Sequence, residues 1–222
     1  DAALAGGEVW GPLHGIPMTV KESYDVEGFV TSWGAPEFET YRPACDALSI
    51  ARLVAAGANV FGKTNVPLFL GDLQTYNALY GTTSNPWDLT RTPGGSSGGS
   101  AAALAAGLTA LDAGSDIASS IRTPAHYCGV YGHKPTFGLV TTRGQLVPGR
   151  IGFTDIAVVG PMARSADDLA LALQIMAGPD DIDARAWRVE LPKPRKERLA
   201  DFRVAVMLDA PHAPVDRDVQ AQ

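Results

Sequence analysis

The sequence is poor in cysteine, histidine and basic charge, and it contains no long hydrophobic run. Its two cysteines, Cys45 and Cys128, form no CxxC pair, so neither a metal site nor a disulfide framework is expected from them. The net charge of −6 leaves no basic excess to neutralise phosphates, which argues against nucleic acid or an anionic membrane as a partner. The longest apolar run, residues 101–111, is interrupted by Gly107 and Thr109 and is too short to cross a bilayer. These features favour a reducing, cytoplasmic setting.

The composition predicts a folded protein. Of the 222 residues, 45% are hydrophobic and 19% are charged, which is enough apolar material for a substantial core. The sequence starts at Asp1 and stops at Gln222, inside what resembles the first turns of a helix after Pro214. We therefore expect a single domain, 1–222, that is truncated at both ends. Its core spans 11–177, a polar loop follows over 178–200, and 201–222 begins a C-terminal portion.

Strands and helices are expected to alternate along the chain. Apolar residues alternate with polar ones over 16–21, where Met18 and Val20 share one face and Lys21 lies on the other. Helical spacing with a Ser165–Asp168 capping box predicts a helix over 165–177. The remaining predicted helices cover 46–56 and 100–106, and the remaining strands 58–61, 155–160 and 202–207. This alternation predicts an α/β fold with a mixed, largely buried sheet.

The stretch "TPGGSSGGSAAALAAG", residues 92–107, is open to several interpretations. A flexible linker is disfavoured because an apolar helix follows at once. Gly94, Ser96 and Gly98 match the G-x-S-x-G pattern of a hydrolase nucleophile turn, but the preceding "NPWDLTRTP" contains two prolines and is not a strand. The composition of this stretch alone does not decide its role.

A second glycine motif, "GANVFGKT", matches the Walker A spacing through Gly57, Gly62, Lys63 and Thr64. A phosphate-binding loop follows a strand and opens a helix, so that the amides at the start of that helix face the phosphates. Here a predicted helix precedes the motif, and Pro67 follows it closely. We therefore predict a helix, a strand and a turn, with no ATP binding.

One lysine and two serine-bearing loops suggest nucleophilic catalysis without histidine. Lys21 ends an apolar strand, and "GSDIASSIRTPA" places Ser119 and Ser120 in a loop. A lysine with its ordinary pKa of about 10.4 stays protonated near neutrality. Burial can lower that pKa to roughly 7–8, which makes the neutral amine a usable base. From the residues alone, Lys21 could equally be an ordinary lysine at a strand end.

Three segments together resemble the amidase signature family of serine amide hydrolases. They are "GPLHGIPMTVKESYDVEG", "TPGGSSGGSAAALAAG" and "GSDIASSIRTPAHYCGVYGHKPTFG", and the similarity runs from about Gly11 to Ala177. The resemblance implies a sheet with helices on both faces, no metal or organic cofactor, and a Ser–cis-Ser–Lys triad. By alignment with the family motifs, Lys21 is the base, Ser96 the bridging serine and Ser120 the nucleophile that forms an acyl-enzyme.

The resemblance also implies an oxyanion hole, in which backbone N–H groups of the loop that leads to the nucleophile would bind the oxyanion. Asp116 and Arg122 flank this loop, and they could pair to hold it or could form a solvated charge pair. The chain departs from the family at Ala118 and Ser119, which replace two glycines, so a distorted hole and a competing hydroxyl at Ser119 are open possibilities. The expected oxyanion donors are those of Ile117, Ala118, Ser119 and Ser120.

Substrate and partners are less clearly marked. In the family that the chain resembles, the acyl pocket draws on the segment after the "GKTN" turn, so Leu70 and Gly71 are candidates to line it, and ordinary core packing is an equal alternative. A stand-alone amidase acting on a small-molecule amide is the first interpretation, with a homodimer as a possible assembly. The alternatives are the A subunit of a glutamyl-tRNA amidotransferase complex and a catalytically weak amidase-like binding protein.

Overall fold

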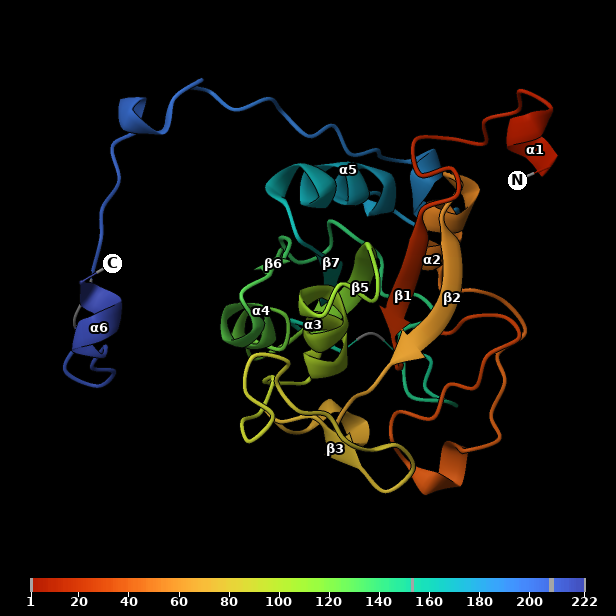
Figure 1. The fold of residues 1–222 in the computed structure, drawn as a ribbon. Coiled ribbons are helices and arrows are strands. Elements are labelled where there is room, and N and C mark those ends of the chain that lie inside the picture. Colours follow the sequence, from red (N-terminus) through yellow and green to blue (C-terminus); the bar gives the residue numbers. More distant parts are fainter. Residues whose placement is uncertain (1, 153, 208–209, 222) are drawn as a thin grey trace. The chain divides into compact units, whose positions relative to one another are not determined.

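The computed structural model describes residues 2–152, 154–207 and 210–221. They fall into two compact units, residues 1–189 and 190–222. The larger unit contains a five-stranded sheet in the order β2-β1-β5-β7-β6 (Figure 1). Its strands are β1 Pro17–Lys21, β2 Asn59–Thr64, β5 Leu111–Asp116, β6 Tyr131–Gly132 and β7 Val158–Ala163.

The sheet is mixed, as predicted. Strand β1 pairs in parallel with β2 and β5, whereas β7 pairs antiparallel with β5 and β6. Because β1, β2 and β5 are parallel, their carboxyl ends lie at the same edge. Lys21, Thr64 and Asp116 are the last residues of these three strands.

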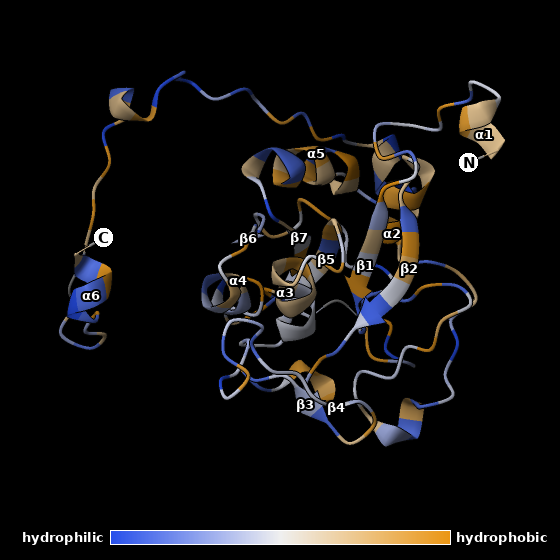
Figure 2. Cartoon of the chain, viewed as in Figure 1, coloured by the Kyte–Doolittle hydropathy of each residue, from blue (hydrophilic) through white to orange (hydrophobic). Residues whose placement is uncertain are grey.

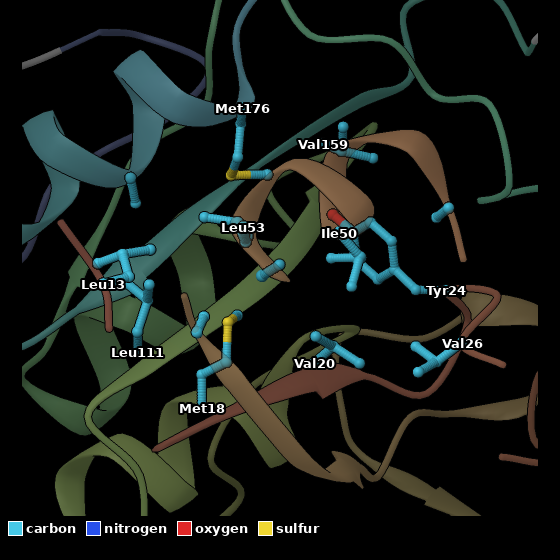
Figure 3. Packing of buried hydrophobic residues seen from close by; sticks show 14 of the residues in the cluster. Leu13, Met18, Val20, Tyr24, Val26, Ile50, Leu53, Leu111, Val159 and Met176 are labelled. Atoms are coloured by element: carbon cyan, nitrogen blue, oxygen red, sulfur yellow. The ribbon is translucent and has the colours of Figure 1, made fainter. Parts of the chain in front are cut away.

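Helices cover both faces of the sheet, which confirms the predicted layering. On one face, α2 Leu48–Ala55 and α5 Ala166–Met176 pack over the larger hydrophobic core. On the other, α3 Gly98–Ala105 and α4 Arg122–Cys128 lie side by side over a smaller cluster (Figure 1). Figure 3 shows the side chains that fill the larger core, among them Met18, Val20, Ile50, Leu53, Leu111, Val159 and Met176.

The alternation of residues along the central strands explains the two layers. Met18 and Val20 enter the core beneath α2 and α5, while Lys21 lies on the opposite face of β1. On β5, Leu111 and Ala113 belong to the same core, while Gly114 faces the α3–α4 side. A Cβ on Gly114 would lie 2.9 Å from Met162 Sδ and 3.0 Å from the side chains of Ile121 and Ser97, so the neighbouring side chains pack closely against this strand position.

The helix that follows β7 agrees closely with its prediction. Ser165 is the N-cap of α5, and its hydroxyl accepts the Asp168 N–H at 3.1 Å, as in the predicted capping box. Figure 2 shows hydrophilic and hydrophobic residues along α5 as expected of an amphipathic helix. The predicted helices 46–56 and 100–106 correspond to α2 and α3, with boundaries that differ by one or two residues.

Two strand predictions need correction. The strand predicted over 155–160 begins at Val158, because residues 154–157 form a turn in which Ile156 has φ +57°. The segment 202–207, predicted as a strand, is not one. Its unit, 190–222, contains no strand among its described residues, so nothing there pairs with the backbone N–H and C=O groups of 202–207.

The remaining elements are short. Described by itself, the unit 190–222 holds the helical turn Leu199–Asp201 and α6 Arg217–Gln220, which begins just after Pro214. Asp1 and Gln222 lie outside the described residues. No helix in the described part of the chain has the length and hydropathy needed to span a bilayer. The larger unit adds α1 Ala2–Ala5, β3 Tyr76–Asn77, β4 Gly81–Thr82 and helical turns at Pro36–Phe38, Leu68–Leu70 and Asp183–Arg185.

Candidate active site

Lys21 is fully buried at the end of β1 and contacts Ser96 in the turn before α3 and Ser115 in β5. Its Nζ lies 2.6 Å from Ser96 Oγ, 3.0 Å from Ser115 Oγ and 3.3 Å from the Ser115 carbonyl oxygen. The lysine and one of the predicted serines are therefore within hydrogen-bonding distance. Ser115 was not singled out in the sequence, because β5 itself was not predicted.

Burial lowers the pKa of Lys21 from 10.5 to about 7, while the negative charges of Asp116 and Asp112 oppose the shift. A buried ammonium loses its hydration, which favours the neutral amine. Near neutral pH a large fraction of Lys21 is therefore unprotonated and able to accept a proton. A neutral amine is the form that a general base requires.

The hydrogen-bond partners of Lys21 other than Ser96 can account for both N–H groups of the neutral amine, which leaves its lone pair for Ser96. The Ser115 carbonyl can only accept a hydrogen bond, so it takes one N–H of the amine. Gln145 Nε2 donates to Ser115 Oγ at 3.2 Å and to Ser23 Oγ at 3.0 Å, and Ser115 Oγ can accept the second lysine N–H. The lone pair then faces the Ser96 hydroxyl. Gln145 carries no local sequence signal for this position, which only the fold creates.

Ser96 lies in the turn that precedes α3, and the peptide bond between Gly95 and Ser96 is cis. The backbone runs so close to its neighbours that a Cβ on Gly95 would lie 2.6 Å from the Gln74 carbonyl oxygen. Gly94 has φ +83°, in the region that favours glycine. The glycines of "TPGGSSGGS" therefore shape a constrained turn, not a flexible linker.

Ser120 lies in the loop between β5 and α4 and opens into the same cavity as Ser96. The cavity has a volume of about 240 Å³. The Ser97 N–H donates to the Ser120 carbonyl at 3.1 Å, which joins the two serine loops. The Ser120 hydroxyl has no hydrogen-bond partner among the described residues, and no histidine there bonds either Ser96 or Ser120.

Asp116 organises the loop around Ser120. Its fully buried carboxylate accepts the N–H groups of Ser119 at 2.9 Å and Ile121 at 3.0 Å, together with the Arg122 Nε and Nη2 at 3.0 Å each. Burial raises the pKa of Asp116, but the hydrogen bonds from Arg122, Ile121 and Ser119 outweigh it and hold the pKa below the usual value. The predicted pairing of Asp116 with Arg122 is present.

Of the four expected oxyanion donors, the Ser119 N–H is already occupied by Asp116. The N–H groups of Ile117, Ala118 and Ser120 have no acceptor in the part of the chain that the structure describes. Ser119 has φ +81°, a left-handed conformation that is rare for residues other than glycine, whereas Ala118 does not have positive φ. The backbone freedom supplied by glycine is thus needed at position 119 and not at 118.

The cavity wall is mainly apolar. Leu70 lines it as expected, but Gly71 does not. Trp33 and Phe69, which the sequence analysis missed, face the same cavity, and both have positive φ. Among the described residues, no group of three or more His, Cys, Asp or Glu side chains is placed to hold a metal ion. Other wall residues are Ile117, Thr142, Leu146, Val147, Arg150, Thr154, Ala157 and Val158.

The "GKT" of the apparent Walker A motif lies inside a strand. Gly62, Lys63 and Thr64 complete β2, which extends three residues beyond the predicted strand, and no helix begins directly after Thr64. Lys63 Nζ donates to the Val30 carbonyl at 2.6 Å and to Thr31 Oγ1 at 2.8 Å. This lysine is therefore engaged with the protein's own backbone.

The fold agrees with a family-level comparison. The amidase family model matches residues 1–222, and this chain belongs to the amidase family. The A subunit of the glutamyl-tRNA(Gln) amidotransferase from a Synechococcus species is 42% identical over 212 residues, which cover 94% of this chain and 41% of that protein. The chain thus spans about two fifths of the length of the curated relatives it matches.

Solved structures show the same fold. The peptide amidase of Stenotrophomonas maltophilia superimposes with a TM-score of 0.75 at 38% identity, over 82% of this chain and 38% of that one. The A subunit of the Thermotoga maritima glutamyl-tRNA(Gln) amidotransferase gives a TM-score of 0.72 at 35% identity, over 81% and 39%. A protein from a vestigial complex connected with the origins of an s-triazine catabolic enzyme gives 0.74 at 47% identity, over 81% and 39%.

Proposed function

We propose that the protein hydrolyses an amide C–N bond, with Ser120 as nucleophile, Ser96 as proton relay and Lys21 as base. The observation that carries the proposal is the 2.6 Å contact between Lys21 Nζ and Ser96 Oγ in a buried site. The lowered pKa of Lys21 supports a neutral amine there. Ser120, with an unpartnered hydroxyl among the described residues, opens into the same cavity as Ser96.

The proposed reaction has two halves. Ser120 Oγ attacks the amide carbonyl carbon, and its proton passes through Ser96 to Lys21. The tetrahedral intermediate then expels the amine, which takes a proton back from Lys21 through Ser96, leaving an ester on Ser120. Water attacks that ester by the same proton route, releases the acid and restores the Ser120 hydroxyl.

The loop 117–120 supplies the electrostatic part of catalysis in this proposal. The N–H groups of Ile117, Ala118 and Ser120 lack protein acceptors in the described part of the chain, so they are able to donate to the oxyanion. Asp116 holds the Ser119 amide and thereby the turn of this loop. Donors that are oriented before the reaction stabilise the developing charge without reorganisation.

The cavity favours an amide with an apolar acyl group. Trp33, Phe69, Leu70 and Ile117 provide hydrophobic surface close to the two serines. Burial of that surface against a substrate supplies binding energy in proportion to the apolar area removed from water. The wall should therefore bind an apolar acyl substituent more tightly than a small hydrophilic one.

A second candidate function is that of the A subunit of a glutamyl-tRNA amidotransferase. The relatives that bear this name are about 42% identical over most of the chain, and they favour this role over that of a stand-alone amidase. In that role the same site would act within a complex, so protein partners are expected. A cytoplasmic location, which fits either role, is retained as part of the proposal.

Active-site labelling tests the shared chemistry. The full protein would be treated with a serine-reactive fluorophosphonate, and the adduct mapped by peptide mass spectrometry. We expect labelling of Ser120 that disappears in Ser120→Ala and falls strongly in Lys21→Met. Labelling of Ser119 instead would contradict the assignment of the nucleophile. A folded protein that takes no label would favour an amidase-like binding protein.

Affinity purification at native expression level separates the two candidate functions. Stoichiometric co-purification of other proteins, with amide hydrolysis that depends on them, would support the amidotransferase role. Hydrolysis of simple amides by the isolated protein, with no bound partner, would support a stand-alone amidase.

A further inference from the structure

Two charged side chains at the carboxyl ends of β1 and β2, the buried Glu22 and the partly buried Lys63, hold one loop segment, residues 30–33. Glu22, which directly follows the base Lys21, is 3% exposed. Its Oε1 accepts the Ser32 N–H at 2.5 Å and the Ser32 hydroxyl at 2.8 Å, and its Oε2 accepts the Trp33 N–H at 2.7 Å. Three donors from two adjacent residues thus converge on one carboxylate.

Lys63 holds the first half of the same segment. Its Nζ donates to the Val30 carbonyl and the Thr31 hydroxyl, so consecutive residues 30–33 are all bonded by one of the two charged side chains. Burial lowers the pKa of Lys63 to about 8, and the carboxylates of Glu22 and Asp25 oppose this shift. We refer to Glu22 and Lys63 together as the loop clamp.

The segment held by the loop clamp forms part of the cavity wall. Trp33 is 7% exposed, lines the cavity and has φ +57°. Its carbonyl accepts the Phe69 N–H at 2.9 Å, and Phe69 and Leu70 have φ +49° and +60°. Bulky residues adopt the left-handed conformation only where their surroundings hold them in it. Trp33 and Phe69 are therefore joined by this chain of hydrogen bonds, and Leu70 follows Phe69 directly in the same wall.

We propose that Glu22 and Lys63 are positioning residues that set the aromatic wall of the acyl cavity and thereby determine the size of the acyl group that the enzyme accepts. The inference rests on the proposed amide hydrolysis at Ser120. Neither residue lines the cavity, so both act through Trp33 and, beyond it, through Phe69 and Leu70. This also gives a role to the lysine of "GKT", which binds no phosphate in this assignment.

Selectivity between a small and a large substrate tests the inference. The full protein and its variants Glu22→Gln, Lys63→Met and Trp33→Leu would be assayed with acetyl and 4-phenylbutyryl p-nitroanilides. A displaced wall penalises the large acyl group most. We therefore expect the ratio of kcat/KM for the large over the small substrate to fall by about 10-fold or more in each variant. A misplacement of 1 Å can lower a rate by about 100-fold. Lys63→Arg, which keeps the donors, should recover most of the ratio.

Matched controls and a second readout keep this test decisive. Glu37→Gln and Lys193→Met remove the same charges at exposed positions and should leave the ratio unchanged. Fluorine NMR of 5-fluorotryptophan-labelled protein, with the Trp33 resonance assigned through Trp33→Leu, measures the environment of the Trp33 side chain and requires no catalysis. We expect that resonance to move or broaden in Glu22→Gln and Lys63→Met and not in the controls.

The possible results separate the two proposals. If Ser120 takes no label but the Trp33 resonance responds, amide hydrolysis fails and the effect of the loop clamp on the wall stands. If folded clamp variants lose both substrates equally, or leave the ratio and the resonance unchanged, the inference is overturned. Should Glu22→Gln fail to fold, Lys63→Met and Lys63→Arg carry the test.

Discussion

The Ser97 N–H donates to the Ser120 carbonyl oxygen over 3.1 Å, joining two loops that are separated by helix α3 and strand β5. Ser97 follows Ser96 directly, and Lys21 Nζ bonds Ser96 at 2.6 Å. One backbone hydrogen bond therefore links the proposed nucleophile loop to the serine that contacts the base. Changes to Lys21, or to the charged residues that hold the Ser120 loop, should therefore have measurable effects on both serine loops.

Activity should depend on pH through Lys21. Because burial lowers its pKa to about 7, the neutral base predominates above that pH and the protonated form below it. The rate of Ser120 labelling should rise through pH 7 and then level off. Lys21→Met should lower the plateau by roughly 10²–10⁴-fold, the usual contribution of a general base. A pH profile of fluorophosphonate labelling measures both effects, and an unchanged plateau in Lys21→Met would contradict the role.

Asp116 should matter far more for stability than its ion-pair partner. Replacing it by Asn puts an amide where backbone N–H donors converge, which should lower the free energy of unfolding by about 2 kcal/mol or more. Arg122→Ala should cost about 1 kcal/mol or less, because the Arg122 side chain is 51% exposed and solvent screens the pair. Chemical denaturation of both variants provides the comparison, and equal losses would refute it.

The pH dependence of this contribution has a definite sign. The pKa of Asp116 is lowered in the folded state, so its stabilising effect is complete above the unfolded value of about 3.9. The effect is lost as the pH falls through the folded value. The stability difference between the wild type and Asp116→Asn should therefore shrink in strongly acidic solution.

Ser119 and Ala118 should respond oppositely to glycine. Ser119 has φ +81°, so Ser119→Gly relieves a strained backbone and should stabilise the protein by about 1 kcal/mol. Ala118 has no positive φ, so Ala118→Gly only adds freedom to the unfolded chain and should destabilise by roughly 0.4–1 kcal/mol. Thermal unfolding of the two single variants tests this contrast. A gain at 118 or a loss at 119 would show that the loop differs from the one described.

Ser115 should tune the base without being the nucleophile. Ser115→Ala removes an oxygen that accepts an N–H of Lys21 and favours the protonated amine. The midpoint of the pH profile should therefore move below about 7, and the plateau should fall by roughly 10-fold as the amine loses its orientation. Gln145→Leu should lower the plateau by a smaller factor, since Gln145 acts on Lys21 only through Ser115. Gln74→Leu is a matched control at an exposed position.

Much of the fold was predictable from local signals, whereas the candidate catalytic residues were assigned from the family resemblance. Alternation along β1 put Met18 and Val20 on one face and Lys21 on the other, and the Ser165 cap located α5. The paired serines and the glycines around Ser96 were visible as motifs. The family resemblance then joined three separate segments, and the matching family model agrees with it.

The missed elements had sequences that local reasoning does not recognise. Strand β5 has the sequence "LDAGSD", with two aspartates and a glycine. Its polar side is buried in the protein, where Asp112 accepts from Thr19 Oγ1 and Gly114 lies against Ile121 and Ser97. The segment 202–207 has the composition of a strand but no partner among the described residues of its unit. Strand propensity expresses burial and pairing as much as local preference, so tertiary context decided both cases.

The sequence by itself determined the residue types, the order of the layers and the family. The side-chain period of a strand or helix is a local property, and the spacing of motifs is printed in the chain. Only the tertiary structure decided that Lys21 is dehydrated enough for its pKa to fall to about 7, and that Ser115 and Gln145 orient it. It also decided that Asp116 occupies the Ser119 amide, and that Glu22 and Lys63 hold the wall at Trp33. Burial, hydrogen-bond partners and electrostatic neighbours come from segments far apart in the chain, so they exist only once the sheet edge has been assembled.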